Sequence, residues 1–169
     1  MIYNIVGKND VQLVLLGKGE SQYEGFFQGL ENAYKDKVRA LITYDRDLSK
    51  RIYAASDIFL MPSKSEPCGL SQMIASRYGA IPVVRETGGL ADSILPYWED
   101  SEGEMHGNGF TFAAYNAHDM LHVIRQAEET YRNKEQWKIV TSNAMKTDFS
   151  WNGPAREYLA LYRKLTNKR

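Results

Sequence analysis

The sequence predicts an α/β fold, with a doubly wound parallel sheet that carries helices on both faces. Short apolar runs alternate regularly with segments of helical periodicity through the first half of the chain. The runs are mostly apolar rather than alternating with polar residues, which is typical of parallel strands buried on both faces. Glycine, proline or polar residues close each run, as expected where strands lead into loops.

The predicted elements follow in this order. Strands are expected at residues 11–16, 38–43, 57–61, 80–85 and 109–112. Helices are expected at residues 23–34, 48–55, 69–78, 120–131, 137–144 and 155–165, where apolar side chains recur at helical spacing. Gly79 is placed to end the helix at 69–78. Residues 96–109 are acidic and glycine-rich, and they are predicted to form an exposed loop.

The chain has 169 residues, enough for one domain with a sizeable core. We expect residues 1–169 to form one domain, with the C-terminal helices of about 117–167 packing on it. Residues 4–10 resemble the tail of an element whose beginning is absent. The first strand of the sheet is therefore expected to be missing, which would make this domain partial.

Charge and cysteine content exclude several classes of protein. The 21 basic and 21 acidic residues cancel, so no overall field attracts nucleic acid or a membrane surface. Cys68 is the single cysteine, which excludes an internal disulfide and fits a reducing compartment. The start of the chain lacks a signal-peptide pattern, and no apolar run is long enough to span a membrane. We expect a soluble, cytoplasmic protein without nucleic-acid or membrane partners.

The loop after the third predicted strand is the strongest candidate for a ligand site. Residues 61–72 read Met-Pro-Ser-Lys-Ser-Glu-Pro-Cys-Gly-Leu-Ser-Gln and lead from a strand end into a helix. Ligands bind beyond the carboxyl ends of parallel strands, and free amides at a helix start favour phosphate. Gly69 would let an anion approach those amides, and the carboxylate of Glu66 suits sugar hydroxyl groups. The alternative is an ordinary helix start, at which Glu66 complements the dipole.

Other candidate residues have structural alternatives too. Cys68 could be reactive at a helix start, could ligate a metal, or could contribute only its backbone amide, and we favour the last. Tyr44, just beyond a strand end, could stack on a base or cap the core. The Gly17-Lys-Gly and Thr87-Gly-Gly stretches are predicted turns. The three histidines form no triad or metal pattern.

Several stretches resemble bacterial glycogen synthases and plant starch synthases. They are Ser-Glu-Pro-Cys-Gly-Leu-Ser-Gln at 65–72, Arg-Tyr-Gly-Ala-Ile-Pro-Val-Val-Arg at 77–85 and Thr-Gly-Gly-Leu-Ala-Asp at 87–92. Residues 11–19, 51–57 and Phe-Ser-Trp at 149–151 are also similar. The resemblance implies the C-terminal domain of a two-domain GT-B enzyme. Such an enzyme is a retaining glycosyltransferase that moves glucose from ADP-glucose to the non-reducing end of an α-1,4-glucan, without a metal or cofactor.

The resemblance also implies roles for individual residues. Glu66 matches the acidic residue that contacts the donor glucose, so it is our catalytic candidate. Tyr44 matches the aromatic residue near the adenine. The remaining substrate-binding candidates lie at the helix start, where backbone amides approach the glucose and the diphosphate: Cys68, Gly69, Leu70 and Ser71.

Departures from the family limit what this chain is expected to do. Ser71 stands where threonine is frequent, and Ser65 where an aromatic residue is common. The arginine and lysine that clamp the diphosphate, and the N-terminal domain that receives the glucan, have no counterpart here. We expect this chain alone to bind ADP or ADP-glucose weakly and to be inactive. The alternatives are a related GT-B enzyme with a UDP-sugar donor and a non-catalytic nucleotide-sugar-binding domain.

Overall fold

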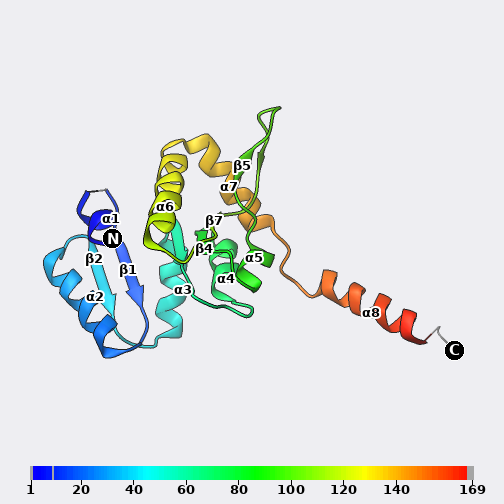
Figure 1. Ribbon diagram of the computed structural model, residues 1–169, viewed down its shortest axis with the longest axis horizontal. Coiled ribbons are helices and arrows are strands. Elements are labelled where there is room, and N and C mark those ends of the chain that lie inside the picture. The colour runs from blue at the N-terminus through cyan, green and yellow to red at the C-terminus, as the bar shows by residue number, and fades with distance from the viewer. Residues whose placement is uncertain (1, 9, 167–169) are drawn as a thin grey trace.

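A computed structural model describes residues 2–8 and 10–166 of the chain (Figure 1). The first half contains α1 (Ile2–Lys8), β1 (Leu13–Leu16), α2 (Ser21–Ala33), β2 (Val38–Leu41), α3 (Arg46–Ala55), β3 (Ile58–Met61), α4 (Ser71–Tyr78) and β4 (Ile81–Arg85). The second half contains α5 (Gly89–Ser93), β5 (Trp98–Glu99), β6 (Met105–His106), β7 (Phe110–Phe112), α6 (Ala117–Arg132), α7 (Lys134–Lys146) and α8 (Asn152–Thr166).

The main strands are parallel, which confirms the predicted α/β class. β1 pairs with β2, and a separate sheet has the order β3-β4-β7, with parallel pairing throughout. Within the described residues, β1 and β3 are not paired with each other, so each has a free edge. The expected absence of a first strand stays a prediction.

β4 is the central strand of the larger sheet, and it is covered on both faces. Ile81 and Val83 point into one core cluster, which they share with residues of β7, α6 and α7. Val84 points the other way, into a cluster with Leu90 and Ile94 at α5. Because successive side chains of a strand alternate between faces, a strand with helices on both sides must be apolar throughout. This explains the continuous apolar run seen in the sequence.

The smaller sheet has a core of its own. Val6 of α1, Leu30 of α2 and Val38 of β2 are buried together, with Phe27 and Tyr34 packed against them. Figure 1 shows α1, α2, β1 and β2 grouped at one end of the molecule.

The helix at 69–78 ends as predicted, because Gly79 adopts a left-handed φ of 84° and donates its amide to the carbonyl of Ser76.

A short hairpin, β5–β6, and the short helix α5 were not predicted. Residues 96–109 contain the hairpin β5–β6, which projects from the body of the molecule in Figure 1. Asp100 closes its turn by accepting hydrogen bonds from the amides of Glu102 and Glu104. Two-residue strands and the five-residue α5 are too short for periodicity to reveal.

The C-terminal helices differ in how they pack. α6 and α7 contact each other and the larger sheet, through buried residues that include Ile124, Ala127 and Val140. Every described residue of α8 is exposed, and Figure 1 shows this helix extending away from the domain. Helices between about 117 and 167 were expected to pack on the domain; α6 and α7 do so, whereas α8 does not. Its apolar stripe covers no other element in the described structure.

Candidate functional site

The candidate site is built on residues 62–70, the loop that joins the carboxyl end of β3 to α4. The half-buried Glu66 lies in the middle of this loop, and its backbone carbonyl accepts a hydrogen bond from the amide of Gly89 at 3.2 Å. The loop is thus fastened to the loop that follows β4. Both loops lie where a ligand of a parallel sheet is expected.

Gly88 and Gly89 make this contact possible. A Cβ atom at Gly88 would lie 2.1 Å from the backbone oxygen of Glu66, and one at Gly89 would lie 2.2 Å from that of Cys68. Only glycine fits at distances this short. The sequence predicted an ordinary turn at these two residues, and the structure gives them a more specific role in holding the candidate loop.

The start of α4 offers free backbone amides. Its first turn is closed by the amide of Ile74, which donates to the carbonyl of Leu70 at 2.9 Å. The amides of Ser71, Gln72 and Met73 therefore have no acceptor within the helix, and the helix dipole adds positive charge there. The helix begins at Ser71, two residues later than predicted.

Gly69 shapes the turn into α4. Its φ of +75° is a left-handed conformation that a residue with a side chain rarely adopts. A Cβ atom there would lie 2.6 Å from Oε1 of Gln72 and 3.1 Å from Cγ of Glu66. The absence of a side chain at Gly69 thus leaves room for the side chains of Gln72 and Glu66.

Gln72 is a buried positioning residue that the sequence did not single out. Its Nε2 atom donates to the carbonyls of Cys68 and Gly69 at 3.3 and 3.0 Å and to Oγ of Ser93 at 3.1 Å. The side chain of Gln72, on α4, therefore joins the loop to α5 through hydrogen bonds. Its Oε1 atom is buried and has no protein partner in the described structure.

Arg85 holds the other end of the loop and was also missed. Its NH1 group donates to the carbonyls of Lys64 and Ser63 at 2.7 and 3.2 Å, and its Nε donates to Ala113 at 3.3 Å. The guanidinium also lies over the ring of Tyr115, 5.4 Å from its centroid. A charged residue at the end of a buried apolar strand could have indicated this role from the sequence.

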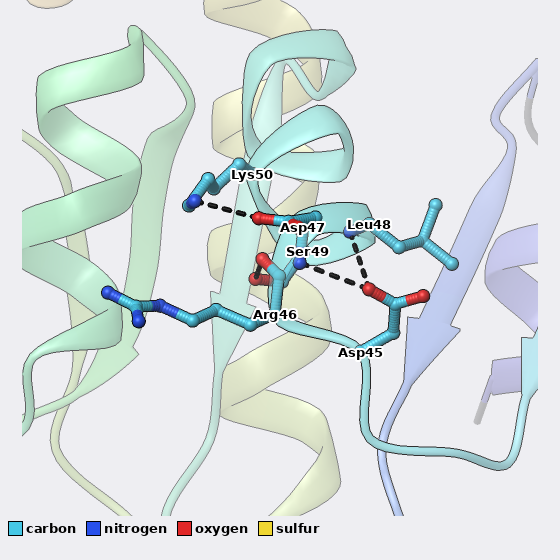
Figure 2. Close-up of polar contacts among 6 residues, drawn as sticks. All are labelled: Asp45, Arg46, Asp47, Leu48, Ser49 and Lys50. Atoms are coloured by element: carbon cyan, nitrogen blue, oxygen red, sulfur yellow. Dashed lines mark hydrogen bonds and ion pairs between the residues drawn. The ribbon is translucent and has the colours of Figure 1, made fainter.

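Tyr44 follows β2, so it belongs to the smaller sheet and not to the one that carries Glu66. Its side chain is 84% exposed and contacts no other ring in the described structure, which leaves both ring faces open. Next to it, Asp45 caps α3 by accepting hydrogen bonds from the amides of Asp47 and Leu48 at 3.0 and 2.9 Å (Figure 2). Figure 2 also shows the side chain of Arg46 extending away from Asp45.

Cys68 is exposed and unbridged, and its thiol lies 3.7 Å from the carbonyl of Gly69. Within the described residues, no three His, Cys, Asp or Glu side chains form a group that could hold a metal ion. The same residues include no helix long and apolar enough to cross a membrane.

A cleft of about 850 Å³ lies behind the loop, between α5 and the end of α7. Cys68 is the only predicted site residue among those that line it, and Lys146, Asp148 and Phe149 also contribute to its lining. Glu66, Gly69, Leu70 and Ser71 lie outside this cleft, and Leu70 is largely exposed.

The fold is an α/β fold whose candidate loop follows the carboxyl end of a parallel strand. Residues 4–144 match the family model of glycosyl transferases group 1, and the chain belongs to that family. It is 51% identical to a glycogen synthase of Bacillus licheniformis over 162 residues, which are 96% of this chain and 33% of the relative. It is 54% identical to a glycogen synthase of Desulforamulus reducens over 156 residues, or 92% and 32% of the two chains. The chain thus spans about a third of the length of these curated relatives.

Solved structures agree with this assignment. The catalytic domain of starch synthase IV from Arabidopsis thaliana, bound to ADP and acarbose, superposes with a TM-score of 0.78 at 41% identity, over 90% of this chain and 32% of that one. A sucrose-phosphate synthase from Thermosynechococcus elongatus has a TM-score of 0.66 at 20% identity, over 99% and 42% of the two chains, which shows the fold alone. The architecture is that of a GT-B C-terminal domain, as predicted.

Proposed function

We propose that this chain is the donor-binding part of a retaining glucosyltransferase that moves glucose from ADP-glucose to the non-reducing end of an α-1,4-glucan. The observation that carries the proposal is the loop at residues 62–70, which contains the half-buried Glu66 and leads into the free amides at the start of α4. Relatives about 50% identical over nearly the whole chain are glycogen synthases, and a similar starch synthase structure holds ADP.

Each part of the site suits one part of the donor. The amides of Cys68, Gly69 and Leu70, together with the free amides of Ser71, Gln72 and Met73, would hold the diphosphate, because the helix dipole stabilises negative charge at the start of α4. The same groups would stabilise the charge that develops on the leaving diphosphate, with no reorganisation during the reaction. Glu66 would accept hydrogen bonds from glucose hydroxyls, which orients the sugar for transfer. The open ring of Tyr44 would stack on the adenine.

We further propose that a strand from elsewhere in the longer protein lies between β1 and β3. The free edges of these two strands support this, since exposed edges of parallel sheets are normally covered. That strand and a second domain would supply the cationic groups for the diphosphate and the binding surface for the glucan. The 169-residue chain alone should therefore bind nucleotide but not elongate glucan. A cytoplasmic location also stays a prediction.

Calorimetric titration of the 169-residue chain with ADP and with UDP tests the donor site. We expect weak binding that favours ADP and is lost in Gly69→Val, because a branched side chain would block the amides and collide with Gln72. Gly103→Val is the matched control: Gly103 also has a positive φ of 84°, but it lies in the β5–β6 turn, away from the loop. Equal binding of ADP by wild type and Gly69→Val would refute the assigned site, and tighter binding of UDP would refute the ADP-sugar donor.

A further inference from the structure

A second cleft, of about 450 Å³, lies far from the donor loop. It is formed by β5, the first residue of β7, the end of α6 and the start of α7. The donor loop follows the carboxyl end of β3, whereas this cleft adjoins the amino end of β7 in the same parallel sheet. The donor loop and this cleft thus lie at opposite ends of the parallel strands. The volume of the cleft is within the roughly 300–1,000 Å³ that small-molecule sites have.

Trp98 lines this cleft with a large aromatic side chain that remains exposed. It is 53% exposed and belongs to none of the core clusters, whereas its neighbour Tyr97 packs against Phe110 in the core. Core packing therefore does not explain a tryptophan at this position. An exposed indole that lines a cleft is typical of a surface that binds another molecule.

The β5–β6 hairpin holds Trp98 in a fixed orientation. The indole stacks on the ring of His106 across the two strands, with centroids 4.6 Å apart and planes inclined by 24°. His106 is held in turn, because its Nε2 lies 2.7 Å from Oδ2 of Asp100, the residue that closes the turn. A ring fixed in this way loses little conformational entropy when a ligand packs on it.

The polar groups around Trp98 are available to a ligand. Gln126 and Glu129 on α6 and Gln136 on α7 line the cleft, and their side chains make no hydrogen bond or ion pair within the described residues. The amides can both donate and accept, and the carboxylate accepts. No lysine or arginine lines the cleft, so its chemistry does not favour a phosphate.

A flat aromatic ring beside amides and a carboxylate matches a neutral sugar. The C–H face of a pyranose packs on the ring, and its hydroxyl groups pair with the amides and the carboxylate. We propose that this cleft is an accessory site for glucosyl units of an α-1,4-glucan, independent of the donor site. The inference rests on the proposed function for the identity of the sugar. A second anchor on a polymeric substrate would raise the effective concentration of chain ends near the enzyme.

The test is titration of the 169-residue chain with maltoheptaose, with cellohexaose as the control sugar and ADP titrated in parallel. We expect maltoheptaose to bind, and Trp98→Ala to weaken that binding about tenfold or more, the loss expected for one aromatic platform. Gln126→Ala, at an exposed helix position that should not disturb folding, should weaken it several-fold. Trp151→Ala is the matched control, because that indole is 73% exposed and lines neither cleft.

Each outcome decides one question. Unchanged binding of maltoheptaose by both Trp98→Ala and Gln126→Ala would overturn the accessory site, as would an equal loss in Trp151→Ala or equal binding of cellohexaose. Binding of ADP without binding of maltoheptaose would overturn the accessory site and leave the proposed function standing. Binding of maltoheptaose through Trp98 without any binding of ADP would support the sugar site and count against the proposed donor function.

Discussion

Substitution of Gly89 by alanine should reveal how strongly the candidate loop depends on the loop after β4. Gly89 is the first residue of α5, and a Cβ atom there would lie 2.2 Å from the carbonyl oxygen of Cys68. An ordinary carbon–oxygen contact needs about 3.3 Å, so the two backbones must separate by about 1 Å. Overpacking of this kind costs about 1–3 kcal/mol. At roughly 2–4 °C per kcal/mol for a domain of this size, the melting temperature should fall by about 2–12 °C.

Gly29→Ala is the matched control, because Gly29 lies inside α2 and a Cβ atom there would meet nothing within 4 Å. This substitution should stabilise the protein by about 0.5–1 kcal/mol, through the higher helix propensity of alanine. Calorimetric unfolding measures the change in stability for Gly89→Ala and for Gly29→Ala. We expect the displaced loop of Gly89→Ala to weaken binding of ADP by roughly tenfold or more, which titration with ADP measures. If Gly89→Ala melted at or above the wild-type temperature and bound ADP normally, the close packing of the two loops would be wrong.

Three further predictions concern single side chains. Arg85→Met removes both hydrogen bonds to the loop, so ADP should bind more weakly, and Arg85→Lys should restore only part of the affinity in the same titration. Asp45→Ala removes the N-cap of α3 and should cost about 1 kcal/mol in thermal unfolding; a cost near zero would contradict the cap. The hydrogen bond from His106 lowers the pKa of Asp100 in the folded protein. The ionised carboxylate should therefore contribute its whole stabilisation above the unfolded-state pKa of about 3.9. This stabilisation should be lost as the pH falls through the lower pKa of the folded state. Titration of this carboxyl group by NMR checks the direction, and a midpoint at or above the usual value would contradict the contact.

The sequence was sufficient for the order of the main elements and for the place of the candidate loop. Both depend on local features: continuous apolar runs, helical spacing, and a glycine such as Gly79 where a helix must end. The loop at 62–70 was found because a strand end followed by a helix start has the same electrostatic character in any fold. The suitability of Gly69 for an anion and of Glu66 for hydroxyl groups followed from these local features, and the family resemblance assigned the two residues to the diphosphate and the glucose of the donor.

Only the tertiary structure decided how that loop is held. Gly88 and Gly89 lie more than 20 residues from Glu66 in sequence, and their need to be glycine comes from a backbone contact that folding creates. The roles of Arg85 and Gln72 depend in the same way on which carbonyls the packed chain brings within reach. The hairpin that orients Trp98 could not be predicted either, because periodicity records which face of an element is buried but not which distant segment covers it.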